Sequence, residues 1–446
     1  MVKNKLKRSF KARHLMMMSV GGVIGAGYFL GAGGAIELAG PAVLIDYFVG
    51  GVIALLVTML LAEMVVAIPV SGSFQVYARM AFNPLMGFLT GLTYWLAFLI
   101  GPASEAIAAG TFLHLWFPTI AIWKFCFLIA TAMMIINTIS AHFFGEIEFW
   151  LSLIKVIALL GFIILGFLAL GVPMHHDLKP FTLSQFAPHG LNGIISAALL
   201  VIFAYGGVES LGTAAEESLN VEKDIPKVIK GITLRIIILY LVSTAVLIMI
   251  LPWQQAGLSS SPFVDAITLL GGKKYGLVLG NLMNFVVLIA ALSCIDAGIY
   301  VTSRMFLSLA REGYFPKFFT YIHPHRKTPV YSVALSSSVL YLGALMSLYS
   351  SNAYAWLASL SGFGFLFSWL MIILSQPIIR KSIVSDKTDV LKWKAPFYPY
   401  TYYLALLLIL AIFIGLFFSP EGRKILLAGL LWFVLIGIYY YVKRKG

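Results

Sequence analysis

The chain has 446 residues, of which 60% are hydrophobic and only 11% are charged. This composition excludes a soluble globular protein and is typical of a protein embedded in a membrane. The formal net charge of +13 does not indicate a nucleic-acid partner. The lysines and arginines gather on one side of the apolar segments, where they face anionic lipid headgroups.

Apolar runs long enough to cross a bilayer core of about 30 Å recur along the whole chain. The loops that follow even-numbered runs carry most of the basic residues, which places both termini in the cytoplasm. No polar stretch between the runs is long enough to bury a core of its own, so residues 1–446 form one integral membrane domain. The predicted membrane-spanning helices are residues 15–36, 43–67, 86–112, 122–140, 148–171, 192–216, 232–251, 276–308, 330–349, 354–376, 401–418 and 425–442.

Glycine clusters interrupt two of these helices, the first at GGVIGAG (21–27) and the sixth at FAYGG (203–207). Glycine is about 1 kcal/mol less favourable than alanine inside a helix, and unwound backbone in lipid has no water to bond. Such breaks persist where they line a cavity enclosed by protein, and a pair of them in two halves of a chain indicates the substrate site of a transporter. Close helix packing through small residues is the structural alternative.

The positions of the two breaks also predict an internal repeat. Residues 15–171 and 192–376 each contain five predicted crossings, and two extra helices follow at about 401–442. Because five is odd, the second set enters the membrane from the opposite side, which makes the repeat inverted. The expected fold is therefore all-α integral membrane, with twelve transmembrane helices, a five-plus-five inverted repeat and broken helices 1 and 6.

The broken helices offer backbone groups to a ligand without using charged side chains. Unwinding around Gly25, Ala26 and Gly27 frees N–H groups that suit a carboxylate. Carbonyls at the end of the preceding half-helix suit an ammonium group, and the break at Ala204 to Gly206 presents the same groups again. Together these groups predict a site for a zwitterion such as an α-amino acid.

Several segments, in order along the chain, resemble the amino acid permeases of the APC (amino acid–polyamine–organocation) superfamily. They are GGVIGAGYFLGAG (21–33), AEMVVAIPVSGSFQVYAR (62–79), FGEIEFWLSLIKVIAL (144–159), FAYGGVESLGTAAEES (203–218) and SRMFLSLAREGYFPKF (303–318). The resemblance implies the broken-helix fold first seen in a sodium-coupled leucine transporter. It also implies uptake of an amino acid, often together with a proton.

Carried over by position, the resemblance implies which backbone groups hold the substrate. The substrate carboxylate would lie on the amides of Ala26 and Gly27. The aromatic ring of Phe203 would close over the substrate as a gate. The substrate amino group would lie on carbonyls near Val23, Phe203, Ala204 and Gly206.

Lys155 is the only lysine or arginine deep inside a predicted span. A charge there costs at least about 2.5–3.5 kcal/mol unless it is paired, hydrated or neutral. The resemblance implies that Lys155 occupies the place of the sodium ion in sodium-driven relatives, which makes it a candidate for proton coupling or for a fixed cation. The alternative is a side chain that extends toward the cytoplasmic Glu146 and Glu148.

Asp296 and Glu105 are the other candidates for proton coupling. Asp296 stands where related permeases carry asparagine, and it either pairs with Lys155 in a buried ion pair or lies lower, near Arg304. Glu105 follows the kink expected at Pro102. It relays a proton, contacts the substrate, or bonds neighbouring helices as a structural carboxyl.

Four further glutamates lie near span ends or the second break: Glu63 near the inner end of the second span, Glu209 just beyond the break, and Glu216 and Glu217 at the end of the sixth span. Glu63 and Glu209 are expected to hold half-helices in place through hydrogen bonds. Glu216 and Glu217 are expected to be cytoplasmic gate or loop charges.

These observations predict a secondary active transporter and not an enzyme. We expect it to import an amino acid with a neutral, apolar side chain across a bacterial plasma membrane, by proton symport and alternating access. An amino acid exchanger and an amine or polyamine carrier are alternatives, ahead of a sensor or a channel. The sequence contains neither a Walker A motif nor a cluster of metal-binding residues, so we expect no cofactor and no metal site.

Overall fold

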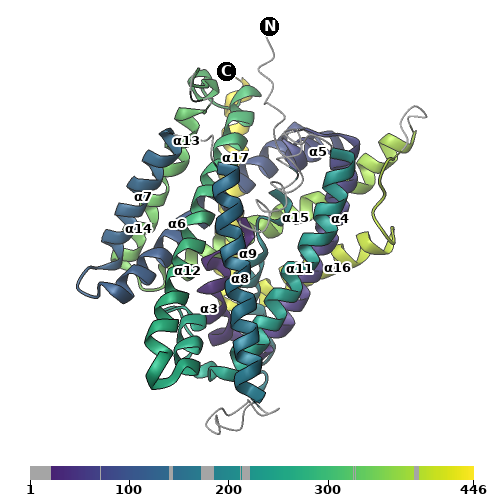
Figure 1. Cartoon of the computed structure of the whole chain (residues 1–446). Helices are drawn as coiled ribbons and strands as arrows, with labels where there is room; N and C mark the ends of the chain where they lie inside the picture. Colours follow the sequence, from purple (N-terminus) through teal and green to yellow (C-terminus); the bar gives the residue numbers. More distant parts are fainter. Residues whose placement is uncertain are drawn as a thin grey trace.

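Helices alone build the described part of this chain, and no strand occurs in it (Figure 1). The computed structural model describes residues 22–70, 72–139, 144–171, 185–210, 212, 221–324, 326, 328–385 and 391–445. Ten segments within these residues are long and apolar enough to cross a bilayer. The expected class, an all-α integral membrane protein, is therefore confirmed.

The helices follow one another with short connections, several of them single turns of 3-10 helix. In chain order they are α2 (Ala26–Phe29), α3 (Gly31–Ala39), η1 (Gly40–Ala42), α4 (Val43–Ala67), α5 (Ser73–Ala81), α6 (Pro84–Trp116), α7 (Ile122–Ile139), α8 (Phe144–Gly171), α9 (Gly190–Tyr205), η3 (Val208–Ser210), α11 (Val221–Ile250), η5 (Trp253–Gln255), α12 (Pro262–Arg311), η6 (Lys317–Thr320), α13 (Val330–Ser338), α14 (Leu340–Tyr349), α15 (Ala353–Ser385), α16 (Tyr400–Phe418) and α17 (Pro420–Lys445).

The ten apolar segments differ from the twelve expected spans in two places. The end of the first expected span and the whole of the second fall within one segment, Ala26–Ala67, because η1 joins α3 to α4 through residues that stay helical. The fourth expected span corresponds to a shorter apolar helix, Ile122–Thr138. A total of twelve crossings therefore stays a prediction.

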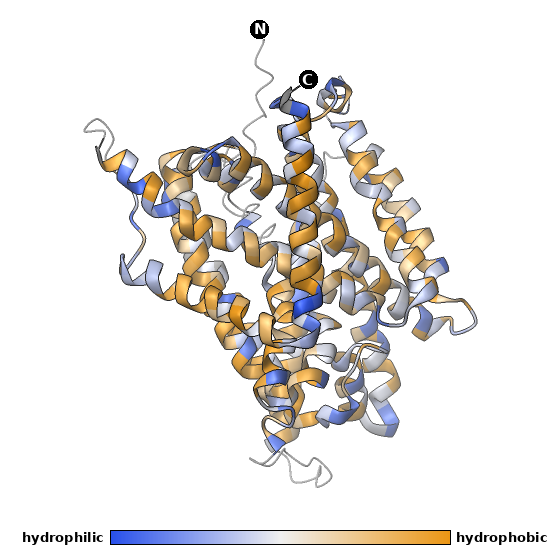
Figure 2. Ribbon diagram, turned by 180° about the vertical axis from the view of Figure 1, so that it is seen from behind, coloured by the Kyte–Doolittle hydropathy of each residue, from blue (hydrophilic) through white to orange (hydrophobic). Residues whose placement is uncertain are grey.

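Hydropathy follows the helices in the way that a bilayer requires. Figure 2 shows hydrophobic residues along most of each helix and hydrophilic residues mainly at helix ends and in connections. On the outer helices α16 and α17, Leu407 and Leu427 are each 65% exposed. Such exposed apolar faces suit contact with lipid. Lipid offers no hydrogen bonds, and a helix needs none from it because its backbone groups are already bonded within the helix.

Helix α6 organises the interior around the two expected breaks. It packs along α12 and α15, and it also contacts α2. Helix α2 in turn contacts α9 and α12. Close approach of α12 to α6 requires Gly298, because a Cβ atom at this position would collide with the ring of Pro102. The region around the break at residues 24–25 is therefore enclosed by α6, α9 and α12.

Helix α12 consists of two helices joined at Gly272, whose φ of 56° and ψ of −160° are not helical. The first piece begins at Pro262. The Ser261 hydroxyl donates a 2.6 Å hydrogen bond to the carbonyl of Phe29. This bond ties the start of α12 to the end of α2, next to the first break.

A buried carboxylate joins α4 to α15 and to the segment before α16. Glu63, only 2% exposed, forms a 3.0 Å ion pair with Arg380. It also accepts hydrogen bonds from the Gln376 side chain at 2.8 Å and from the Ala395 amide at 2.7 Å. Glu63 thus makes the expected hydrogen bonds, but its partners belong to α15 and to the segment before α16 and not to the half-helices of the two breaks.

Replacing Glu63 with alanine should lower the stability of the purified protein by about 3–5 kcal/mol, because the replacement leaves the Arg380 charge without its partner. The apparent melting temperature in detergent measures this effect. Glu421→Ala is the matched control, since its ion pair with Lys424 is exposed and exposed pairs contribute about 0–1 kcal/mol. Equal melting temperatures for the two variants would contradict the role of Glu63.

Candidate functional site

The first helix break lies at Ile24 and Gly25. Gly22 and Val23 are helical, residues 24–25 form a bend, and α2 begins at Ala26. Gly25 has an extended backbone, with φ of −133° and ψ of −163°, and a side chain there would collide with the Cys294 sulfur. The break expected in helix 1 is confirmed, while Gly21 of the same motif lies outside the described residues.

The second break follows α9, which ends at Tyr205. Gly206 leaves the helix with φ of −56° and ψ of 140°, and Gly207 has a φ of 103°, a conformation that glycine adopts without strain. The Glu209 carboxylate accepts hydrogen bonds from the Gly207 amide at 3.2 Å and from the Trp369 indole at 2.9 Å. The break and the expected supporting role of Glu209 are confirmed, whereas Glu216 and Glu217 lie outside the described residues.

Tyr240 of α11 connects the two breaks. Its hydroxyl lies 3.1 Å from the carbonyl of Val23 and 3.2 Å from the carbonyl of Ala204, and both contacts are hydrogen bonds with the hydroxyl as donor. Its ring stacks on Tyr28, with ring centroids 3.7 Å apart. Sequence reasoning missed Tyr240 because nothing in its local pattern sets it apart among the 21 tyrosines of the chain.

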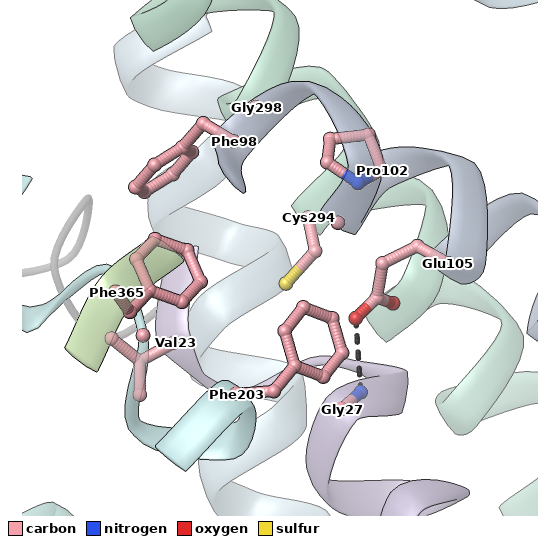
Figure 3. A pocket seen from close by; sticks show the side chains of 12 residues that line it. Val23, Gly27, Phe98, Pro102, Glu105, Phe203, Cys294, Gly298 and Phe365 are labelled. Carbon is pink, nitrogen blue, oxygen red and sulfur yellow. Dashed lines mark hydrogen bonds between the residues drawn. The ribbon is translucent and has the colours of Figure 1, made fainter. Parts of the chain in front are cut away.

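The carboxylate of Glu105 sits on the two amides that the sequence assigns to a substrate carboxylate. One oxygen accepts from the Ala26 amide at 2.8 Å, and the other accepts from the Gly27 amide at 2.9 Å (Figure 3). Of the three roles that the sequence left open for Glu105, the structure shows hydrogen bonding between helices, here α6 and α2. It also shows that the paired amides fit a carboxylate.

A small cavity lies between the two breaks, with Glu105 on its wall (Figure 3). Its volume is about 30 Å³, enough for about two water molecules but not for an amino acid. Glycines and aromatic rings dominate its lining, which consists of Gly22, Val23, Gly27, Phe98, Gly101, Pro102, Glu105, Phe203, Gly206, Cys294, Gly298 and Phe365.

Phe203 occupies the place that the sequence assigns to a gate. Its ring lies against Gly27 of α2 and Gly101 of α6, where an added Cβ atom would come within 3.0 Å and 3.2 Å of it, respectively. The ring also stacks toward Phe365, with ring centroids 6.5 Å apart. The two glycines therefore provide the space that the Phe203 ring fills, and its movement as a gate stays a prediction.

Lys155 is fully buried on α8 and is paired with Glu148, about two turns before it on the same helix. The Lys155 amine lies 3.9 Å from the Glu148 carboxylate and donates a 2.8 Å hydrogen bond to the Ser293 hydroxyl. That hydroxyl lies 2.7 Å from both Glu148 oxygens, to which it can donate. The sequence placed Glu148 at the cytoplasmic surface, but it is only 1% exposed, because the Lys155 charge and two hydroxyls compensate its burial.

Asp296 does not form the expected ion pair with Lys155. Its carboxylate accepts a 2.6 Å hydrogen bond from the Asn137 side chain of α7. The alternative partner, Arg304, lies over the Tyr300 ring at 3.2 Å from the ring centroid. The pair of Asp296 with Lys155, one of the two positions that the sequence allowed for Asp296, is therefore wrong. Its physical reason is helix register, because Ser293, three positions before Asp296 on α12, is the residue that reaches Lys155.

Comparison with known proteins identifies the family of this chain. The profile of the family described as amino acid permease matches residues 14–445. The amino-acid permease RocE of Bacillus subtilis (strain 168) is 37% identical, over 99% of this chain and 96% of the relative. A putative histidine permease and a gamma-aminobutyric acid permease of the same organism are 35% and 33% identical, each over 99% of this chain and 94% of the relative. The resemblance found in the sequence motifs is confirmed.

Replacing Tyr240 with phenylalanine should loosen both helix breaks while keeping the stacked ring. Two buried carbonyls lose their shared donor, which makes local opening about 1–3 kcal/mol easier. Backbone hydrogen exchange at residues 22–29 and 203–209 should then accelerate by about tenfold or more. Tyr47→Phe is the control, because the buried Tyr47 hydroxyl makes no hydrogen bond within the described residues; equal exchange in the two variants would contradict the bridging role.

Proposed function

We propose that this chain, which belongs to the amino acid permease family, imports a neutral amino acid into the cell by symport with a proton. The observation that carries the proposal is the pair of amides, Ala26 and Gly27, that holds a carboxylate inside a cavity between two broken helices. Carbonyls of the facing break, among them that of Ala204, suit the ammonium end of the same substrate.

The composition of the cavity supports a substrate with a neutral, apolar side chain. Among the described lining residues, Glu105 is the only acid or base, and its carboxylate is engaged by backbone amides. The rings of Phe98, Phe203 and Phe365 offer apolar surface to a side chain. Two relatives with similar sequence identity to this chain are named for different compounds, histidine and gamma-aminobutyric acid. Sequence identity therefore does not select a substrate, and the proposed substrate class rests on the lining of the cavity.

The buried Lys155 supports a proton as the coupling ion in preference to sodium. The resemblance places this residue where sodium-driven relatives bind sodium. Its ammonium group, which is bonded to Ser293 and paired with Glu148, supplies a fixed cation there. Lys155, Glu105 and Asp296 are the candidates for carrying or tuning the coupled proton. Asp296 does not line the cavity, so it is the weakest of the three candidates for proton coupling.

The size of the cavity supports alternating access. A space of about 30 Å³ holds no amino acid, so the helices around it must separate to admit and release one. The proposed moving unit consists of the first, second, sixth and seventh predicted spans, which rock against the remaining spans. These four spans are residues 15–36, 43–67, 192–216 and 232–251. In the cell, the protein would lie in a bacterial plasma membrane with both termini in the cytoplasm, as the distribution of basic residues predicts.

A second candidate, an amine carrier, has one observation in its favour. Glu105 already supplies a carboxylate at the Ala26 and Gly27 amides. An amine without a carboxyl group would therefore leave no amide unpaired, provided that Glu105 stays in place.

Uptake into liposomes by the purified protein tests the proposal. Labelled amino acids and their decarboxylated amines are offered with an imposed proton gradient, with a sodium gradient, and with neither. We expect uptake of a neutral amino acid that accelerates with an inward proton gradient and does not respond to sodium. Sodium-driven uptake would contradict proton symport, uptake only into preloaded liposomes would indicate an exchanger, and uptake of amines alone would indicate the amine carrier.

A further inference from the structure

Resting on the proposed function, we propose that Glu105 is an internal stand-in for the substrate carboxylate and the acceptor of the transported proton. In the unloaded protein its carboxylate closes the site by holding the Ala26 and Gly27 amides. The arriving substrate carboxylate displaces it from these amides, and a proton binds to the displaced Glu105.

The geometry makes the two carboxylates mutually exclusive. Each oxygen of Glu105 accepts one backbone hydrogen bond, at 2.8 Å from Ala26 and 2.9 Å from Gly27. Each of these amides has one N–H group, and both lie in the first turn of α2, where no preceding carbonyl of the helix can accept them. A substrate carboxylate can therefore take the two amides only when Glu105 leaves them.

When Glu105 is displaced from the two amides, its buried negative charge has no neighbouring group that neutralises it. Glu105 is 4% exposed, and two ionised carboxylates in one buried site repel each other strongly, so that one of them binds a proton. The titratable groups of the packed helices around Glu105 are Lys155 of α8, Cys294 of α12 and Tyr354 of α15. The positive charge of Lys155 lies 3.9 Å from the Glu148 carboxylate, so this one cation is shared between Glu148 and Glu105.

The other groups near Glu105 support this assignment. Tyr354 donates its hydroxyl hydrogen to the Ala26 carbonyl at 2.8 Å, so it fixes the helix that carries the amides and leaves the Glu105 oxygens to them. Cys294 lines the same cavity, and its thiol carries no charge to offset a second carboxylate. Protonation is the change that lets Glu105 remain buried beside a bound amino acid.

The step conserves charge and atoms without any further reactant. A proton from the outer solution forms an O–H bond on one Glu105 oxygen as the zwitterionic substrate enters. After the site opens inward and the substrate carboxylate leaves, Glu105 releases the proton to cytoplasmic water and returns to the amides. One proton therefore crosses with each amino acid, and each cycle moves one positive charge.

Proton uptake on binding tests this role directly. First, thermal stabilisation of the full-length protein in detergent identifies which of the proteinogenic L-amino acids binds. Calorimetric titrations with that amino acid, in buffers of different ionisation enthalpy near neutral pH, then give the number of protons taken up per molecule bound. We expect about one proton for the unaltered protein.

Two comparisons separate the role of Glu105 from general effects. Glu105→Gln keeps the size of the side chain but cannot ionise, so binding of the amino acid to this variant should take up no proton. Glu421→Gln is the control, because Glu421 is exposed on α17. Binding to this control should still take up about one proton. The carboxamide of the same amino acid, which has no carboxylate to displace Glu105, should bind to the unaltered protein without proton uptake. This measurement stands even if Glu105→Gln does not fold.

The outcomes distinguish this inference from the proposed function. Binding of an amino acid without proton uptake by the unaltered protein would overturn the role of Glu105 and leave amino acid transport standing. Unchanged proton uptake in a folded Glu105→Gln would also overturn it and direct attention to another group. Failure of every amino acid to bind, with binding of amines instead, would overturn the proposed function and this inference together.

Discussion

The structure depends on one interaction, in which the Glu105 carboxylate bridges the free amides of Ala26 and Gly27. Unwound backbone inside a membrane needs partners, because neither lipid nor bulk water supplies them. Glu105 provides two such partners from α6 and lines the cavity of about 30 Å³ between the breaks. The same bonds make the backbone a carboxylate site and keep that site occupied until a competing carboxylate arrives.

The remaining polar residues of the interior hold this arrangement in place. Tyr240 joins the carbonyls of both breaks, and Glu209 accepts from the second break and from Trp369. Lys155 and Glu148 compensate each other beside the cavity. Each buried charge or free backbone group named here is bonded to a partner on a different element or a different turn. Because these polar groups are paired inside the protein, broken helices are tolerated in so apolar a chain.

The sequence predicted the features that leave a local signal. Apolar length indicates membrane helices, and glycine clusters indicate the breaks near Gly25 and Gly206, because glycine inside a membrane helix needs a reason. Pairings between distant elements leave no such signal. Glu148 was placed at the surface, and Asp296 was left between Lys155 and Arg304, because helix register alone cannot say which residue of α12 faces α8. Tyr240 went unnoticed for the same reason.

Substrate and Glu105, as we propose, compete for one pair of amides. An experimental structure with the transported amino acid bound tests this claim most directly, through the atoms within hydrogen-bonding distance of the Ala26 and Gly27 nitrogens. We expect the substrate carboxylate to lie on both amides and the Glu105 carboxyl group to have moved away from them. A bound amino acid beside a Glu105 that still holds both amides would contradict it.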